Sequence, residues 1–271
     1  MPAFRIVTPT FNSGWMLEET VRSVVRCLGP EDRYIIVDGG STDGSVEALR
    51  QWAPRNVEFR RDSGGGMYDA ITTGFSDCEE PLMAWINASD VYLDGALDWV
   101  RAEFVRTQAD LVHFDDLYID NHGSVICRSR GTVRNIRGAM RVGWTPLQDG
   151  CFWTSALYRA TGGITARWKL AGDFDFFLRA FQHGTTAHGR GVVSAFRRHE
   201  GQLSRGKSNA YADERRMILR ADGGNGFRHG FRCSPSNLAR RLSLAISART
   251  GRMRTTTPFA NADVRTLHAC L

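Results

Sequence analysis

Alternation of short apolar runs with amphipathic segments is the feature that most constrains the fold of this 271-residue chain. Strand-like runs bounded by turn residues occur at 4–8, 34–38, 57–60, 82–87 and 111–115. Between them, apolar residues recur at helical spacing, most clearly in 15–28 and 45–53. Strands that alternate with helices through short links favour a mostly parallel sheet covered on both faces. The sequence therefore predicts an α/β fold.

The order of elements is looser in the second half. Asn121-His122-Gly123 indicates a hairpin turn between two short strands. The pattern of 173–181 predicts a helix, and 192–196 predicts a strand. Glycine-rich 223–230 is typical of a linker, and 236–248 has the apolar stripe of a basic amphipathic helix.

Composition makes several classes of protein improbable. No run of about eighteen apolar residues occurs, so a transmembrane helix is not expected. The N-terminus lacks the charged-then-apolar pattern of a signal peptide. The six cysteines form no C-x-x-C pair and the seven histidines form no cluster with metal-ligand spacing, which favours reduced thiols over disulfides or zinc. We therefore expect a cytoplasmic protein.

The net charge of +6 is unevenly distributed. Between Arg197 and Arg254 there are fourteen Lys/Arg against four Asp/Glu, and 128–141 holds five arginines. Such surfaces would suit phosphate groups or anionic lipid at the inner face of a membrane, although a solvated basic face is the simpler interpretation. Nucleic acid is not an expected partner, because no recognised binding module is present.

Three polar clusters follow predicted strands, namely Thr8–Asn12, Asp38–Gly44 and Asn87–Asp90. Each alone is typical of an ordinary turn, because Gly, Ser, Thr and Asp are common at strand ends. Ligands of open α/β sheets bind at the carboxyl ends of the strands. Three clusters in one sheet therefore favour a binding site at that edge.

The sequence resembles the family 2 glycosyltransferases. Six segments occur in the order and approximate spacing of that family: TPTFN, VDGGSTDGS, SGGGMYDAI, WINASD, AGDFDFFLRAF and RRHEGQLS. The resemblance covers about residues 3–205 and points to the branch that builds bacterial capsule, exopolysaccharide and glycolipid sugars. It implies the GT-A fold, a Rossmann-like sheet flanked by helices. It also implies inverting transfer of a sugar from a UDP- or GDP-linked donor to a hydroxyl of a glycan or glycolipid acceptor.

The resemblance also divides the chain. Residues 1–205 are expected to form the GT-A domain, with 1–115 as the nucleotide-sugar-binding half and 116–205 as a smaller acceptor-side half. Residues 206–271 are expected to form a basic, partly helical C-terminal extension.

Site residues follow from the matched positions. The resemblance implies nucleotide-sugar contacts from Thr8, Pro9, Thr10, Asn12, Asp38, Tyr68, Asp69, Asn87 and Ser89. It implies that Asp90 coordinates Mg²⁺ or Mn²⁺ on the diphosphate, that His199 touches the metal or the leaving diphosphate, and that Gln148 lines the acceptor side. Asp173 matches the general base, which would accept the proton of the incoming hydroxyl.

Asp173 has two competing interpretations. Its position also suits the N-cap of the helix that it begins. Asp175 is a rival base or an acceptor-side residue, but positions two apart on a helix do not share a face, so at most one of the two should enter the cleft.

Two positions depart from the family pattern. Gly64-Gly65 stand where the family usually has Asp-Lys, so a base or phosphate contact is either missing or supplied elsewhere, for example by Arg60 or Arg61. Ser89 stands where the family usually has an aspartate, and hard cations prefer carboxylate oxygens. A metal would therefore depend mainly on Asp90.

These observations predict an enzyme of bacterial surface glycan synthesis that acts on a lipid-linked or polysaccharide intermediate. A catalytically degenerate homologue, which binds nucleotide-sugar or a partner without transfer, is the first alternative because of Ser89 and Gly64-Gly65. A nucleotidyltransferase is the second, but it usually needs a glycine-rich N-terminal loop with a basic residue, which this chain lacks.

Overall fold

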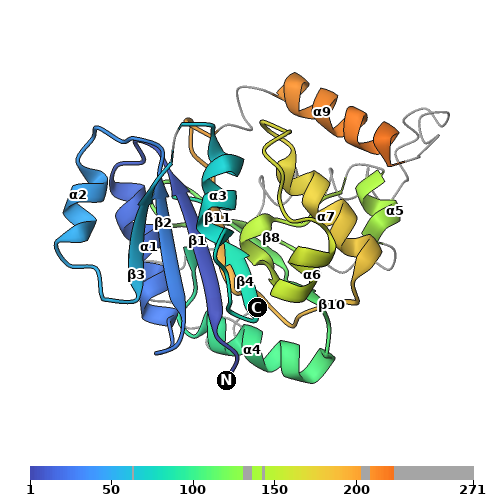
Figure 1. Cartoon of the computed structure of the whole chain (residues 1–271), viewed down its shortest axis with the longest axis horizontal. Coiled ribbons are helices and arrows are strands. Elements are labelled where there is room, and N and C mark those ends of the chain that lie inside the picture. The colour runs from blue at the N-terminus through green and yellow to red at the C-terminus, as the bar shows by residue number, and fades with distance from the viewer. Residues whose placement is uncertain (63, 131–135, 142–143, 203–207, 223–271) are drawn as a thin grey trace.

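The computed structural model describes residues 1–62, 64–130, 136–141, 144–202 and 208–222, which form an α/β fold with two sheets (Figure 1). The larger sheet has the strand order β10-β6-β9-β4-β1-β2-β3. Its strands are β1 (Phe4–Thr10), β2 (Arg33–Asp38), β3 (Val57–Arg61), β4 (Leu82–Trp85), β6 (Leu111–His113), β9 (Cys151–Thr154) and β10 (Thr186–His188). β9 is antiparallel to β4 and β6, and the other paired strands run parallel.

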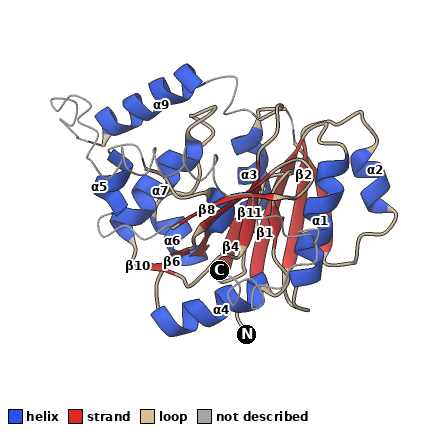
Figure 2. Cartoon of the chain, turned by 180° about the vertical axis from the view of Figure 1, so that it is seen from behind, coloured by secondary structure: helices blue, strands red, loops and turns tan. Residues whose placement is uncertain are grey.

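Helices cover both faces of this sheet, as the two opposite views show (Figures 1 and 2). One face packs against α1 (Trp15–Cys27), α2 (Ser45–Arg50) and α4 (Ala96–Thr107). The other face packs against α3 (Met67–Phe75), α5 (Ile136–Arg141), α6 (Ser155–Ala160), α7 (Gly172–His183) and α9 (Ser208–Ala221). Successive strand residues alternate between the two cores: Ile6 and Ile36 belong to the first, and Val7 and Ile35 to the second.

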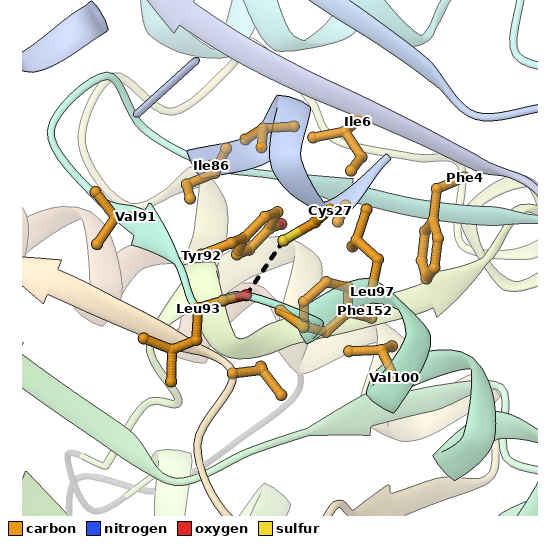
Figure 3. Packing of buried hydrophobic residues seen from close by; sticks show 14 of the residues in the cluster. Phe4, Ile6, Cys27, Ile86, Val91, Tyr92, Leu93, Leu97, Val100 and Phe152 are labelled. Carbon is orange, nitrogen blue, oxygen red and sulfur yellow. Dashed lines mark hydrogen bonds between the residues drawn. The ribbon is translucent and has the colours of Figure 1, made fainter. Parts of the chain in front are cut away.

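The first core is apolar and closely packed (Figure 3). Phe4 and Phe152 meet edge to face, with ring centroids 6.0 Å apart. Cys27 at the end of α1 is buried, and its thiol donates a hydrogen bond of 3.1 Å to the carbonyl of Leu93 (Figure 3). The thiol therefore serves in packing, as the expectation of reduced cysteines implies.

The second core brings α3 unusually close to the sheet. A Cβ at Gly74 would lie 2.5 Å from a methyl group of Val7 and 3.2 Å from one of Val37. Only glycine permits this approach, and it fixes the N-terminal turn of α3 beside the carboxyl ends of β1 and β2. Trp85 on β4 stacks on Phe177 of α7, with ring centroids 5.7 Å apart, so α7 is held against the same face.

The smaller sheet has the order β5-β11-β7-β8, with β5 (Val91–Tyr92), β7 (Asp116–Ile119), β8 (Val125–Ser129) and β11 (Ser194–Arg197). β7 and β8 are antiparallel, which confirms the hairpin predicted at Asn121-His122-Gly123. β11 pairs with β5 and β7 and so carries residues from late in the chain to the strand that follows Asp90.

The predicted α/β class and the five early strands are confirmed. The sequence patterns did not predict strand β9. Its short run of buried residues also does not indicate whether the strand is parallel or antiparallel. The expected helix at 236–248 and the linker at 223–230 lie outside the described residues. α9 falls within the extension predicted from residue 206, yet it packs against α7 of the domain (Figure 1).

Candidate functional site

A cavity of about 1000 Å³ lies at the carboxyl ends of β1, β2 and β4. Its walls come from the loops after these strands, the first turn of α3, the segment at 145–148, the start of α7, the loop after β11 and α9. We call the part formed by Pro9, Thr10, Asn12 and Gly39 the strand end. We call the part formed by Tyr68, Leu170, Asp173 and Tyr211 the helix end.

The strand end is a set of cross-linked loops. The Asp38 carboxylate accepts hydrogen bonds from the Ser41 backbone N–H at 2.8 Å and from its hydroxyl at 2.7 Å. Asn12 binds the same loop twice: its N–H donates to Ser41 Oγ at 2.9 Å and its side-chain oxygen accepts from Thr42 N at 2.8 Å. These bonds hold the backbone of both loops open toward the cavity.

Two residues expected at the strand end do not line the cavity. Thr8 is fully buried, because its hydroxyl bonds Tyr34 Oη at 2.8 Å and the Ile86 carbonyl at 2.9 Å. Asp38 lies behind its neighbour Gly39 and organises the loop. Pro9, Thr10 and Asn12 do line the cavity, as expected.

The helix end centres on Asp173 in the first turn of α7. Tyr68 Oη donates to the Leu170 carbonyl at 3.0 Å and to Asp173 Oδ1 at 3.2 Å, and Phe174 N–H donates to the same oxygen at 2.7 Å. A Cβ at Gly172 would lie 2.9 Å from the Tyr68 ring, so the glycine allows this close packing. Asp173 therefore has a fixed orientation on the cavity wall.

Burial raises the pKa of Asp173 above its usual range, while the Phe174 N–H, the Tyr68 hydroxyl and the Arg215 charge act in the opposite direction. A carboxylate with a raised pKa binds a proton more strongly than a solvated one, which suits a general base.

Asp175 requires a correction, because it is not among the residues that line the cavity. Its carboxylate pairs with Arg179 one turn later at 2.6 Å. Asp69 also lies off the wall, with Lys169 Nζ 3.8 Å from its carboxylate.

Asp90 is fully buried beneath the cavity floor, which corrects its expected position beside the diphosphate. One carboxylate oxygen accepts from Arg197 N–H at 3.0 Å, and the other accepts from Gln148 Nε2 at 3.3 Å. Burial, with the nearby Asp149 charge, raises the pKa of Asp90 well above its usual range, and burial raises that of Asp149 to about 6. Arg197 also donates to the Ser89 carbonyl at 2.9 Å. Asn87, Ser89 and Gln148 consequently line the cavity, whereas Asp90 supports them from below.

The donor set for the expected cation is incomplete in this arrangement. Among the described residues, no group of three or more His, Cys, Asp and Glu side chains is placed to hold a metal ion. The buried side-chain oxygens of Asn87 and Gln148 have no hydrogen-bond partner, but they are neutral, and Ser89 offers only a hydroxyl. Because Mg²⁺ and Mn²⁺ prefer carboxylate oxygens, the residues at this wall do not fit either ion well.

Two basic side chains do line the cavity. His199, in the loop after β11, is where the sequence placed a diphosphate contact. Lys169 was not predicted; its ammonium donates to the Gly65 carbonyl at 2.9 Å, next to the N-terminus of α3. Arg60, considered earlier for this role, is tied to Glu58 at 2.7 Å and Asp77 at 2.8 Å. No pattern around Lys169 marked it, because its position depends on the fold of the loop before α7.

Tyr211 is another cavity residue that sequence reasoning missed. It lies on α9, in the segment that was expected only to be basic and partly helical. Within the described ranges, no helix is both long and apolar enough to cross a bilayer.

The sequence is similar to known glycosyltransferases. The sequence model of the family described as Glycosyl transferase family 2 matches residues 5–159. The chain is 26% identical over 194 residues to a PGL/p-HBAD biosynthesis glycosyltransferase of Mycobacterium bovis, covering 67% of this chain and 71% of that protein.

Solved structures share the fold. Residues 1-349 of S. aureus TarS in complex with UDP-GlcNAc align with a TM-score of 0.66 at 15% identity, over 94% of this chain and 74% of that one. A longer TarS chain gives a TM-score of 0.63 at 14% identity, and this chain spans 45% of it.

Proposed function

The chain belongs to glycosyl transferase family 2 and has the GT-A fold, and we propose that it transfers a sugar from a nucleotide diphosphate to an acceptor hydroxyl with inversion at the anomeric carbon. The observation that carries this proposal is the placement of Asp173. It is a partly buried, oriented carboxylate on the wall of a cavity whose other end is built from the loops after β1 and β2.

The donor nucleotide would lie at the strand end. Backbone groups of Thr10 and Gly39 and the side chain of Asn12 border the space there, which suits a base and ribose. Residues 1-349 of TarS have been solved in complex with UDP-GlcNAc and with UDP. We infer a UDP- or GDP-linked sugar for this chain.

Asp173 would act as the general base at the helix end. Its free oxygen can accept the proton of an acceptor hydroxyl as that oxygen attacks the anomeric carbon from the face opposite the leaving group. The bond from the anomeric carbon to the diphosphate breaks in the same step, and the proton remains on the carboxyl group. Tyr68 holds the carboxylate in place for this transfer.

The leaving diphosphate needs positive charge or N–H donors as its bond breaks. Lys169 and His199 line the cavity, and the exposed N–H groups of the first turn of α3 lie beside Lys169. Mg²⁺ or Mn²⁺, when bound, would add charge to the same oxygens. Because the donor set fits a metal poorly, we assign no step to it.

The acceptor would be a lipid-linked or polysaccharide intermediate of bacterial surface glycan synthesis. In support, the mycobacterial relative is a glycosyltransferase of PGL/p-HBAD biosynthesis. We also propose a cytoplasmic location with peripheral contact to anionic lipid. Three arginines of the basic segment 128–141 already have acidic partners within the protein. Arg128 pairs with Asp115, and Arg137 and Arg141 pair with Asp222, so these three are not free to bind lipid phosphates.

The competing function is that of a degenerate homologue, which binds nucleotide-sugar or a partner without catalysing transfer. The neutral Ser89 on the cavity wall and the burial of Asp90 favour it, whereas the ordered Asp173 favours catalysis.

Calorimetry separates the two functions. The full chain is titrated with UDP, GDP and other nucleoside diphosphates, with Mn²⁺ and with EDTA, and the donor sugars of each binding nucleotide are then tested for turnover. Binding together with transfer or slow hydrolysis of a donor supports the proposal. Nucleotide binding without turnover of any donor would support the degenerate homologue.

A further inference from the structure

α9 lies outside the matched family segments, and its Glu214 contacts the site. The Glu214 carboxylate accepts hydrogen bonds from three successive backbone N–H groups: Lys169 at 3.1 Å, Leu170 at 2.9 Å and Ala171 at 2.8 Å. These residues form the segment that leads directly into α7, and Ala171 is the N-cap residue of that helix. No side chain of the segment itself caps the helix.

The same segment is fixed to the catalytic wall from its other side. The Leu170 carbonyl accepts a hydrogen bond from Tyr68 Oη, which also donates to Asp173 Oδ1. Lys169 extends from the segment to the Gly65 carbonyl. The positions of Tyr68, Asp173 and Lys169 therefore depend on this short backbone segment, and Glu214 accepts hydrogen bonds from its N–H groups.

The chemistry of this contact suits a precise anchor. Bonds from N–H groups to an ionised carboxylate are shorter and stronger than neutral ones, and three of them fix a backbone in both position and orientation. A negative charge near the N-terminus of α7 is also stabilised by the helix dipole. Glu214 is only partly exposed, so water competes weakly for its oxygens.

The rest of α9 is arranged around the same point. Tyr211, one turn before Glu214, lines the cavity. Arg215 packs over the Phe174 ring, 4.3 Å from its centroid, and lowers the pKa of Asp173. Asp213, in contrast, is exposed and pairs with Arg216 on the solvent side of the helix.

We propose that Glu214 is a positioning residue for sugar transfer, which holds Lys169–Ala171 so that Asp173 and Lys169 face the reacting groups. The proposal rests on the function proposed above. α9 is thus part of the active site, and the catalytic unit extends beyond the segments that identify the family.

The test uses the full chain with Glu214→Gln and Glu214→Ala, and Asp213→Asn as a matched control on the same helix. We expect Glu214→Ala to lower kcat by about 30- to 100-fold, because small displacements of a reacting group have effects of this size. Glu214→Gln keeps one acceptor oxygen, so its kcat should lie between Glu214→Ala and wild type. The dissociation constant of the nucleoside diphosphate should change less than about threefold, because the strand end is untouched. Asp213→Asn should match wild type in both quantities.

Two results would overturn the proposal: a kcat of Glu214→Ala within about threefold of wild type, or equal losses of nucleotide affinity and kcat in both Glu214 variants. If Glu214→Ala does not fold, Glu214→Gln, with its melting temperature measured alongside, decides between the same outcomes. Failure of the proposed function looks different, since wild type itself would then bind nucleotide and turn over no donor.

Discussion

At the strand end of the cavity, the Asp38 carboxylate accepts hydrogen bonds from the hydroxyl and the N–H of Ser41. It orders this loop and does not line the cavity itself. At the helix end, Asp173 is held by Tyr68 and Phe174 and faces the cavity. Both acids belong to matched segments, but Asp38 ends strand β2 and Asp173 lies in the first turn of α7. The comparison shows that one carboxylate orders a loop, whereas the other faces the cavity.

Asp90 is a third case. It follows a strand as Asp38 does, but its carboxylate is fully buried under Asn87 and Ser89. Burial raises its pKa, so the neutral form is favoured there. Its bonds to Arg197 and Gln148 tie β4, β11 and the turn before β9 together. Two acids that follow strands therefore have structural roles: Asp38 orders a loop, and Asp90 supports the cavity floor.

The sharpest test of this division is Asp173→Asn. The amide cannot accept a proton at neutral pH, so we expect kcat to fall by about 10²- to 10⁴-fold with little change in nucleotide affinity. Because the pKa of Asp173 is raised in the folded state, its ionised form opposes folding, and stability falls as pH rises through that pKa. The variant should therefore melt no lower than wild type at pH 7.5. Asp175→Asn is the control and should keep kcat within about threefold; an equal loss there would remove the distinction between the two acids.

Variants of Asp90 distinguish a structural role of this carboxylate from a role as metal ligand. Asp90→Ala leaves the Arg197 N–H unpaired in the interior, so we expect unfolding in urea to show a loss of about 1–3 kcal/mol. Asp90→Asn retains an acceptor for this N–H, and a rotated Gln148 amide can accept from the new NH₂ group. It should keep most of the stability and the nucleotide affinity. A stable Asp90→Asn that loses Mn²⁺-dependent nucleotide binding would instead identify Asp90 as a metal ligand.

The pH dependence of transfer tests the environment of Asp173. The base must be ionised, so activity should fall as pH drops through its raised pKa, at a higher pH than for a solvated aspartate. Arg215→Met removes a positive charge that lowers this pKa, so the acid limb of kcat should move to higher pH. Arg216→Met, which removes a charge on the solvent side of α9, should leave the profile unchanged.

The smallest expected effect is at the strand end. Ser41→Ala removes two hydrogen bonds of that loop, one to Asp38 and one from Asn12, so nucleotide affinity should weaken by about three- to tenfold at unchanged kcat. Ser45→Ala, whose hydroxyl bonds Asp43 outside the cavity, is the control. A loss of kcat in Ser41→Ala would show that the two ends are coupled.

Much of the fold was accessible from the sequence, because alternating apolar runs and glycine-rich turns follow from local rules. The hairpin at Asn121-His122-Gly123 and helix α7 are examples. Strand direction was not accessible for β9, since parallel and antiparallel buried strands have the same composition.

The site was only partly accessible. Motifs located Asn12, Tyr68 and Asp173 on the cavity wall, but they could not show that Thr8 and Asp90 lie beneath it. Neighbouring residues at the end of a strand point in opposite directions, so only one of them faces the cavity. The motifs do not show which one it is. Lys169 and Tyr211 were missed because their positions depend on how α9 packs against the loop before α7.

The most direct test of the central claim is the anomeric configuration of the product. A single base opposite the leaving group predicts one displacement, so proton NMR of the first product should show the configuration opposite to that of the donor. A product with the donor's configuration would contradict the account, because it would require either a second nucleophile or attack from the face of the leaving group.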